Sequence, residues 1–208
     1  MRRLFALALA GLSAACSPDT ATRDGEALPR AVVETSLGTI TIELREDAAP
    51  VTVANFIAHA GAGHLDGGSF YRTSRPDNAR ADAPPMYIIQ GGHSFDGLPG
   101  AEGIAHEPTE ETGLSHVRGA VSMARDEVGT ATTEFFVMIN DVPGLDSGPG
   151  GRNPDGAGYA VFGAVVEGMD VAEAIWQQPA GRADAPEGFG SQFLVEPVRI
   201  ERVRIERP

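Results

Sequence analysis

The side chains that most often carry out chemistry are sparse in this chain of 208 residues, and they do not fall into a familiar catalytic spacing. Five histidines are present, but none forms a His-Glu-x-x-His pair, and the single cysteine cannot complete a zinc site. The sequence contains no Gly-x-Ser-x-Gly nucleophile turn and no Gly-x-x-x-x-Gly-Lys phosphate loop. The glycine-rich stretch 148–158 lacks the acid spacing of a calcium loop. We therefore expect no metal ion, no cofactor and no nucleophilic mechanism.

Short runs of alternating apolar and polar residues predict that the elements positioning any site are mainly β-strands. Residues 31–35 and 39–44 alternate on either side of a turn, which is typical of a hairpin. In the last strand, Val203 and Ile205 follow the preceding alternation one residue out of phase, as a bulge would require. The other expected strands are residues 70–72, 87–90, 120–123, 135–139, 159–162 and 195–205.

Two helices are expected among these strands. The first begins near Pro50, carries apolar residues at helical spacing, and ends at Gly61. The second is expected over residues 169–176, with Asp170 as a candidate cap. Many short strands with two helices and glycine-rich turns favour a closed barrel, which leaves no strand edge exposed.

Composition and charge exclude several classes of partner. The net charge is −13 and the apolar fraction is 42%, which is typical of a soluble globular chain. Binding to nucleic acid depends on Lys and Arg that neutralise phosphates, so an acidic chain argues against it. We expect no nucleic-acid partner, and we expect a monomer.

Five motifs stand in an order that resembles one known family. They are Phe70-Tyr71-Arg72, Ile89-Gln90-Gly91-Gly92, Gly119 to Arg125, Thr130 to Phe136, and Tyr159 to Gly163 followed by Glu167-Gly168-Met169. They resemble the Phe-His-Arg, Gln-Gly-Gly, Gly-x-x-Ser-Met-Ala, Thr-x-x-Ser-Gln-Phe-Phe and Val-Phe-Gly motifs of cyclophilins. The resemblance covers about residues 31–205. It implies a closed eight-stranded antiparallel barrel capped by two α-helices, and peptidyl-prolyl cis-trans isomerase activity.

The chemistry of that reaction agrees with the absence of a nucleophile or metal. A peptide bond before proline isomerises over a barrier of about 18–20 kcal/mol without any covalent bond breaking. A catalyst needs an apolar pocket for the proline ring and a fixed donor for the twisted amide. The resemblance implies that Arg72 supplies this donor and that Gln90 orients it. It also implies a substrate-binding set, consisting of Tyr87, Ile88, Ala124, Arg125, Glu134, Phe136, Leu145 and Tyr159.

Five of these residues depart from the family pattern (Tyr87, Ile88, Arg125, Glu134 and Tyr159), and an insertion accompanies them. Glu134 replaces a glutamine, and its carboxylate could pair with Arg72 or Arg125. Tyr87 stands where many members have phenylalanine. Residues 74–86 form an insertion between Arg72 and Gln90 that predicts a loop beside the pocket. These departures leave open a non-catalytic module that binds proline segments, or a structural envelope lipoprotein of the same fold.

The amino terminus predicts export. Arg2 and Arg3 precede an apolar stretch and a run of small residues, so residues 1–15 have the layout of a secretory signal peptide. The segment Leu12 to Cys16 resembles the lipobox of bacterial lipoproteins, which implies a lipid anchor on Cys16. The alternative is ordinary cleavage after Ala15, which would leave a free thiol on a soluble periplasmic protein.

The remaining organisation follows from composition. Residues 16–29 are polar, small and without periodicity, and this predicts a flexible linker. The folded domain is expected over residues 30–208. We expect the protein in the periplasm or cell envelope, with its membrane contact made only through Cys16, acting on proline-containing segments of exported proteins.

Overall fold

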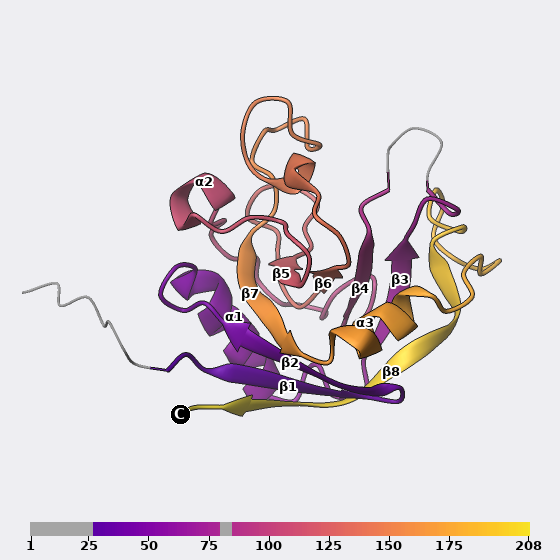
Figure 1. The fold of residues 1–208 in the computed structure, drawn as a ribbon, viewed down its shortest axis with the longest axis horizontal. Helices are drawn as coiled ribbons and strands as arrows, with labels where there is room; N and C mark the ends of the chain where they lie inside the picture. The colour runs from indigo at the N-terminus through magenta and orange to yellow at the C-terminus, as the bar shows by residue number, and fades with distance from the viewer. Residues whose placement is uncertain (1–26, 80–84) are drawn as a thin grey trace, which may run out of the picture.

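Eight antiparallel strands close on themselves in the computed structural model, which describes residues 27–79 and 85–208 (Figure 1). They pair in the order β1-β2-β7-β5-β6-β4-β3-β8, so the last strand in the sequence joins the first and completes the barrel. The strands are β1 Arg30–Thr35, β2 Gly38–Leu44, β3 Ser69–Ser74, β4 Ile88–Gly92, β5 Ala120–Met123, β6 Phe135–Met138, β7 Val161–Glu167 and β8 Phe193–Glu206. The predicted closed eight-stranded antiparallel barrel is confirmed.

Helices pack against the barrel. Helix α1 (Pro50–Gly61) contacts β8 and β7, and α3 (Met169–Trp176) contacts β2, β4 and β3. The carboxylate of Glu107 accepts hydrogen bonds from the backbone N–H groups of Val51 and Thr52, which satisfies two unpaired donors at the start of α1. Both predicted helices are confirmed, but the predicted cap of the second is wrong, because α3 has Gly168 at its N-cap and Asp170 inside its first turn. The short α2 (Thr109–Thr112) and the 3-10 turn η1 (Pro143–Leu145) add to them.

The interior of the barrel is filled by aromatic and branched side chains from opposite walls. Phe56 of α1 lies against Phe135 and Phe162, with ring centroids 5.5 Å and 5.1 Å apart. Phe70 of β3 meets Phe135 edge to face at 5.7 Å. Each of these rings is at most 2% exposed. Burial of this kind stabilises a domain by about 1.5–3 kcal/mol for each large apolar side chain. Because these side chains fill the interior of the barrel, a substrate site must lie on its outer wall.

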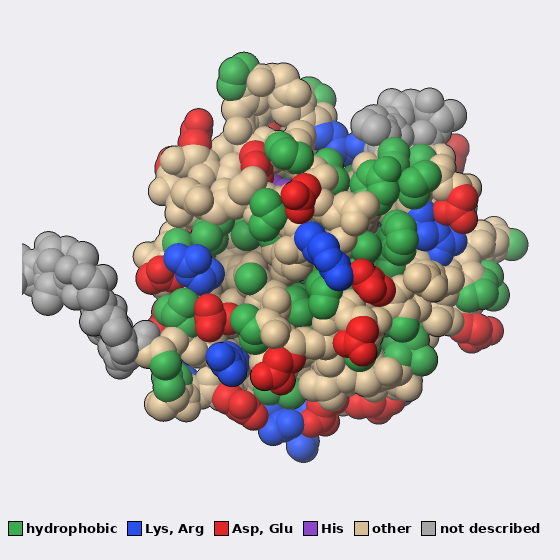
Figure 2. Space-filling view, viewed as in Figure 1, with side chains coloured by type: hydrophobic (Ala, Val, Ile, Leu, Met, Phe, Trp, Pro, Cys, Tyr) green, Lys and Arg blue, Asp and Glu red, His purple; other side chains and the backbone are tan. Residues whose placement is uncertain are grey.

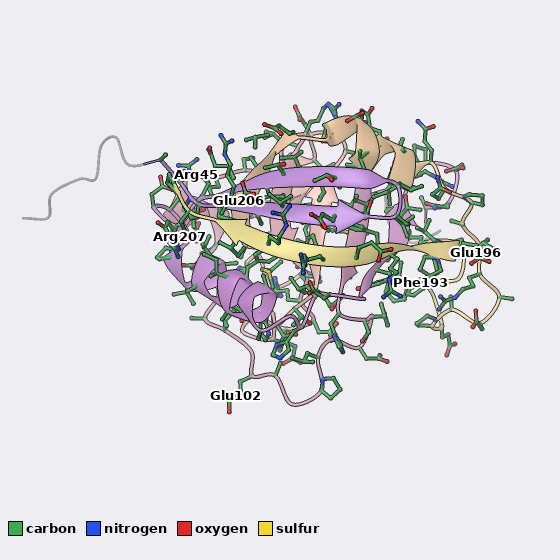
Figure 3. All side chains as sticks on the ribbon, turned by 90° about the horizontal axis from the view of Figure 1, so that it is seen from below. Arg45, Glu102, Phe193, Glu196, Glu206 and Arg207 are labelled. Atoms are coloured by element: carbon green, nitrogen blue, oxygen red, sulfur yellow. The ribbon has the colours of Figure 1, made fainter. Side chains whose placement is uncertain are left out.

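Strand β8 contains the predicted bulge. Thr35 pairs with Ile200 and Glu34 pairs with Arg202, so Glu201 is the extra residue. The shift brings Val203 to the buried side after Val198 and Ile200. Figure 3 shows β8 running along the barrel from Phe193 at one end to Glu206 at the other. The strand therefore connects the wall beside β3 to the wall beside β1.

Acidic and basic side chains are interspersed on the face drawn in Figure 2. Several form exposed ion pairs, such as Arg118 with Glu173 and Arg204 with Glu34. Exposed pairs of this kind contribute about 0–1 kcal/mol each. In the described part of the chain, no helix is long and apolar enough to span a membrane. The predicted signal peptide (residues 1–15), Cys16 and most of the predicted linker lie outside the described residues, as do residues 80–84 of the insertion.

Candidate active site

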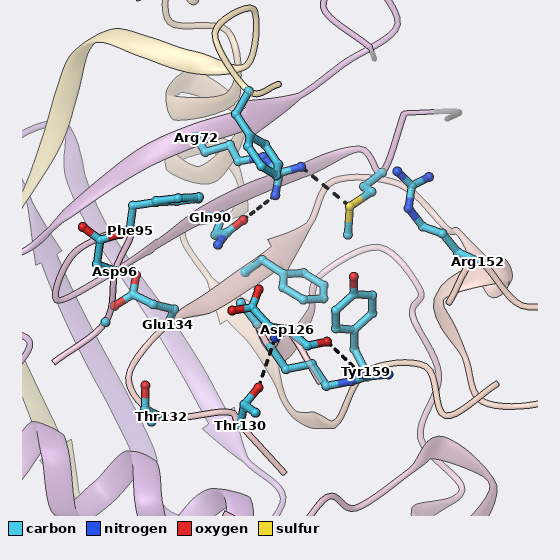
Figure 4. Close-up of a pocket in the computed structure, with 16 residues that line it drawn as sticks. Arg72, Gln90, Phe95, Asp96, Asp126, Thr130, Thr132, Glu134, Arg152 and Tyr159 are labelled. Atoms are coloured by element: carbon cyan, nitrogen blue, oxygen red, sulfur yellow. Dashed lines mark hydrogen bonds between the residues drawn. The ribbon is translucent and has the colours of Figure 1, made fainter. Parts of the chain in front are cut away.

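A cavity of about 480 Å³ opens on the outer wall of the barrel beside β3, β4 and β6 (Figure 4). It contains both apolar rings and charged groups, and segments far apart in the sequence contribute to it. The residues that line it are Arg72, Met86, Gln90, Phe95, Asp96, Gly97, Ala124, Arg125, Asp126, Thr130, Thr132, Glu134, Phe136, Arg152, Tyr159 and Phe189.

Arg72 lies on β3 with its guanidinium at the cavity and is only 8% exposed. Its Nη1 donates to Oε1 of Gln90 at 2.5 Å. Its Nε and Nη2 both donate to Oε1 of Gln192, at 2.9 Å and 2.7 Å. The ring of Phe189 lies 5.0 Å from its Cζ. The predicted relation between Arg72 and Gln90 is present, because these two residues are directly opposite in the β3–β4 ladder.

A chain of hydrogen bonds continues from Gln90 into the barrel wall. Its Nε2 donates to the hydroxyl of Tyr71 at 3.0 Å, and that hydroxyl donates to Oε2 of Glu134 at 2.8 Å. The other oxygen of Glu134 accepts from the backbone N–H of Ser94 and from Thr133 Oγ1. The predicted partners of Glu134 were Arg72 or Arg125, whereas its carboxylate receives hydrogen bonds from Tyr71, Ser94 and Thr133.

Burial controls the titration of this chain of groups. Burial raises the pKa of the Glu134 carboxyl, and the hydrogen bonds from Tyr71, Ser94 and Thr133 oppose that shift in part. Burial also raises the pKa of the Tyr71 hydroxyl well above its ordinary value, and the neighbouring Glu134 carboxylate adds to the effect. Tyr71 therefore keeps its proton at neutral pH and can donate to Glu134 while it accepts from Gln90.

Space for the Glu134 carboxylate is provided by a glycine. A Cβ on Gly92 would lie 2.6 Å from Oε1 of Glu134, which is closer than non-bonded atoms approach. The backbone of Gly92 also has φ +151°, a conformation that side chains disfavour. The second glycine of the Gln-Gly-Gly motif thus allows Glu134 to reach Tyr71.

The apolar part of the cavity is formed by Phe136, Met86 and Tyr159. The rings of Phe136 and Tyr159 meet edge to face at 5.3 Å. Ile88 and Leu145 are fully buried and belong to the same apolar cluster as Phe136 and Met86. The sequence placed Ile88 and Leu145 in the pocket lining, whereas the structure places both behind it, as support for the lining residues.

Tyr87 does not line the cavity. Its ring stacks on Trp176 of α3, with centroids 6.4 Å apart, and its backbone has φ 54°. A non-glycine residue in this left-handed conformation turns its side chain away from the direction that strand alternation predicts. Met86 contributes to the cavity wall, with its sulfur 3.9 Å from Nη2 of Arg72.

Ala124 and Arg125 reach the cavity as predicted, but Arg125 is held by neighbouring groups. It forms an ion pair with Asp155 at 2.8 Å, donates to the carbonyl of Gly158, and lies 5.5 Å from the ring centre of Tyr159. This pairing lowers the pKa of Asp155 to about 2. The backbone N–H of Ala124 donates to the carbonyl of Glu134. Arg125 therefore fixes the loop that carries Tyr159.

Behind Phe136 lies a buried group that sequence reasoning did not find. His116 is fully buried, with Nδ1 2.6 Å from Oδ1 of Asp146 and Nε2 3.1 Å from Oγ of Ser122. Burial lowers the pKa of His116, although Asp146 opposes the shift. The arrangement has the residue types of a hydrolase triad. Ser122 is fully buried, however, so no substrate can reach its hydroxyl, and the trio braces the pocket.

Among the residues that the sequence analysis missed are Met86, Phe95 and Phe189, which line the cavity, and Gln192, which bonds to Arg72. Phe95 and Phe189 line the cavity, and their ring centroids are 5.6 Å apart. For Phe189 the available signal was its place with Phe193 in a stretch, residues 179–193, that is otherwise rich in glycine, proline and polar residues. Among the residues described, no group of three or more His, Cys, Asp or Glu side chains could hold a metal ion.

Comparisons with known proteins agree on one family. Residues 30–205 match the family described as cyclophilin type peptidyl-prolyl cis-trans isomerase/CLD. A peptidyl-prolyl cis-trans isomerase of Streptomyces antibioticus is 34% identical over 179 residues, which are 83% of this chain and 96% of the relative. Peptidyl-prolyl cis-trans isomerase B of Escherichia coli is 31% identical, over 82% of this chain and 96% of the relative.

Solved structures show the same fold. A cyclophilin type isomerase of Cryptosporidium parvum, crystallised in the presence of the dipeptide Ala-Pro, superposes with a TM-score of 0.65 at 19% identity and covers 86% of this chain and 99% of that one. The cyclophilin AquaCyp293 from Hirschia baltica gives a TM-score of 0.59 at 19% identity, covering 84% of this chain and 73% of that one. With the match over residues 30–205, these findings establish that the chain belongs to the cyclophilin-type peptidyl-prolyl cis-trans isomerases.

Proposed function

We propose that this protein accelerates the cis-trans isomerisation of X-Pro bonds in exported proteins as they fold. The observation that carries the proposal is the position of Arg72, whose guanidinium shares one cavity with Gln90 and Phe136. The opposite finding, with Arg72 directed away from these residues, would have removed the basis for catalysis.

The reaction needs a group that binds the twisted amide better than the planar one. In a planar X-Pro amide, the nitrogen lone pair is shared with the carbonyl, whereas rotation about the C–N bond localises it on nitrogen. An N–H donor fixed beside that nitrogen gains a hydrogen bond only as the bond twists, and this lowers the barrier. Arg72 is suited to this role because a guanidinium is planar, permanently charged and rich in N–H groups.

The apolar side of the cavity supplies the grip on the proline ring. Phe136, Met86 and Tyr159 form its walls, and Ile88 and Leu145 support them from behind. A pyrrolidine ring held against these side chains fixes one end of the rotating bond, while the preceding residue turns. The site residues assigned from the sequence are thus proposed to fall into two groups. Arg72 and Gln90 act on the amide, and Phe136 with Tyr159 holds the ring.

The cellular setting is proposed from the sequence alone. Residues 1–15 act as a signal peptide, Cys16 carries a lipid anchor, and residues 16–29 tether the domain in the periplasm or cell envelope. The clients would be exported chains, for which uncatalysed isomerisation takes tens to hundreds of seconds. Mass spectrometry of the wild type and Cys16→Ser tests the anchor. An acyl mass on the wild type alone supports it, and an unmodified wild type contradicts it.

The catalytic proposal is tested with a short peptide that contains one X-Pro bond, by measuring its cis-to-trans rate with the purified full-length protein. Arg72→Ala should lower the catalysed rate by roughly 100-fold to 1,000-fold, the range seen when one transition-state donor is removed. Arg199→Ala is the matched control, because Arg199 is an exposed arginine on β8. A catalysed rate that is unchanged in Arg72→Ala would contradict the role of Arg72, and a wild type that does not accelerate the reaction would favour a module that only binds proline segments.

A further inference from the structure

The segment between α3 and β8 reaches the site from far along the chain. Residues 177–192 connect these elements, and Gln192 stands 120 residues after Arg72. The connection is fixed to β8 at its start, where Ala180 pairs with Leu194 and Gly181 donates to the carbonyl of Phe193. It is fixed again at its end, where the N–H groups of Gln192 and Phe193 donate to the carbonyl of Phe189. These backbone hydrogen bonds hold the chain around Gln192 in place independently of any contact that its side chain makes.

The connection is also joined directly to the strand that carries Arg72. The carbonyl of Gln192 accepts from the N–H of Thr73, at 2.9 Å, and Arg72 pairs with Phe193 in the β3–β8 ladder. The ring of Phe193 stacks on Tyr71 with centroids 5.5 Å apart. These contacts place the carboxamide of Gln192, whose residue is 2% exposed, beside the guanidinium.

Different residues hold the different edges of the Arg72 guanidinium. One edge, formed by Nε and Nη2, converges on Oε1 of Gln192, and Nη1 donates to Gln90. The ring of Phe189 covers a face of the group. An arginine side chain has about 2 kcal/mol of rotamer entropy, and a donor contributes to catalysis only when it is already oriented. Carboxamides are uncharged acceptors, so Gln192 orients the cation without neutralising it.

We propose that Gln192 and Phe189 are positioning residues that hold the guanidinium of Arg72 in its catalytic orientation. The proposal deepens the isomerase function and rests on it. Gln90 bonds to Nη1, at one corner of the guanidinium. The two bonds to Gln192 hold the opposite edge and resist rotation about the Cδ–Nε bond, and Phe189 limits displacement out of the plane. A donor misplaced by about 1 Å can lower a rate by about 100-fold.

A double-mutant cycle tests whether Gln192 acts through Arg72. Gln192→Leu keeps the approximate size of the side chain and removes the acceptor. We expect it to lower kcat/KM by about 10-fold to 100-fold when Arg72 is present, mainly through kcat. In an Arg72→Ala background the same change should cost less than about twofold, because there is no guanidinium left to orient. Phe189→Leu should show the same dependence with a smaller loss.

The controls separate positioning from a general loss of structure. Ser191→Ala alters the neighbouring residue, whose hydroxyl bonds to the carbonyl of Asn78, and should leave kcat/KM unchanged. An equal loss from Gln192→Leu in both backgrounds would overturn the proposal, and so would wild-type activity in Gln192→Leu. Near-UV circular dichroism checks that each variant retains the native packing.

A measurement on the wild type covers the case in which Gln192→Leu fails to fold. In ¹⁵N NMR, the Nε–H of Arg72 should exchange with water at least about 10-fold more slowly than that of the exposed Arg199, because it is buried and bonded to Gln192. Similar exchange rates for the two Nε–H groups would overturn the proposal that Gln192 holds the guanidinium of Arg72. Failure of the isomerase function has a different signature, since the wild type would then lack activity while the Nε–H of Arg72 stayed protected.

Discussion

The ring of Phe136 lies face to face with the buried ring of His116, with centroids 5.9 Å apart and planes inclined by 16°. His116 in turn is fixed between Asp146 and Ser122. Asp146 also accepts from the backbone N–H of His116 and directly follows Leu145, which supports the pocket. The imidazole of His116 therefore supports both Phe136, at the back of the proposed proline pocket, and the turn that carries Leu145 and Asp146.

We expect His116→Ala to destabilise the fold and weaken substrate binding together. The change leaves a cavity behind Phe136 and removes a partner from Ser122, which should lower the free energy of unfolding by about 2–4 kcal/mol. KM should rise because Phe136 loses its support. Urea unfolding and steady-state kinetics measure the two effects. Val117→Ala, at the exposed neighbouring position, is the control, and a His116→Ala protein with unchanged stability would contradict the bracing role.

The buried carboxyl of Glu134 should make stability depend on pH. Burial raises its pKa above the ordinary value of 4.5, so the folded state binds the proton more tightly than the unfolded state. Its contribution to stability is therefore complete below about pH 4.5 and is lost as the pH rises through the raised pKa. Relative to Glu134→Gln, the wild type should lose stability as the pH increases over this interval.

Urea unfolding of wild type and Glu134→Gln between about pH 4 and pH 8 measures this difference. Glu102→Gln, on an exposed loop, provides the control and should follow the wild type at every pH. A constant or rising stability difference between wild type and Glu134→Gln would show that burial does not govern this carboxyl.

Substitutions at positions 86 and 87 should distinguish a residue that lines the cavity from a neighbour that does not. Met86 lines the cavity, whereas Tyr87 stacks on Trp176. Met86→Ala should therefore raise KM by about 5-fold to 30-fold, through lost apolar contact of roughly 1–2 kcal/mol. Tyr87→Ala should leave KM within about twofold of wild type. A larger rise in KM for Tyr87→Ala than for Met86→Ala would show that Tyr87, and not Met86, contacts the substrate, as the resemblance implied.

A single methyl group at position 92 should disturb the hydrogen-bond chain behind Gln90. In Gly92→Ala the new Cβ would collide with Glu134, so the carboxylate must move away from Tyr71. We expect the free energy of unfolding to fall by about 1–3 kcal/mol and kcat/KM to fall with it. Gly100→Ala is the matched control, because Gly100 also has a positive φ but has nothing near its Cβ position. Equal effects at the two glycines would show that backbone strain, and not Glu134, is responsible.

Strand alternation and ordered motifs were enough to predict the barrel, its two main helices and the bulge in β8. They also brought Arg72, Gln90, Phe136 and Tyr159 to one cavity. The resemblance implied that Tyr87 lines the pocket, but the positive φ at this position turns its ring toward Trp176, and a motif match carries no information about such a local backbone conformation. The four-residue α2 was missed because one turn of helix has no periodicity to detect.

The role of Gln192 could not be read from the sequence for a different reason. It lies at the end of a connection without periodic pattern, and only the β3–β8 register brings it beside Arg72. His116 was likewise one histidine among five, with its partner Asp146 thirty residues away. Contacts of this kind depend on the register of paired strands and on side-chain packing between distant segments, which local residue patterns do not encode.

Closure of the barrel by its final strand also determines when the protein can begin to work. Strand β8 bonds to β1 and β3, and the connection that precedes it supplies Gln192. A chain that emerges with its amino terminus first has Arg72, Gln90 and Phe136 available while β1 and β3 still lack a neighbour. Prematurely terminated chains that stop before the connection and β8 would thus lack Gln192 and a strand neighbour for both β1 and β3, so the site is complete only once β8 has been synthesised.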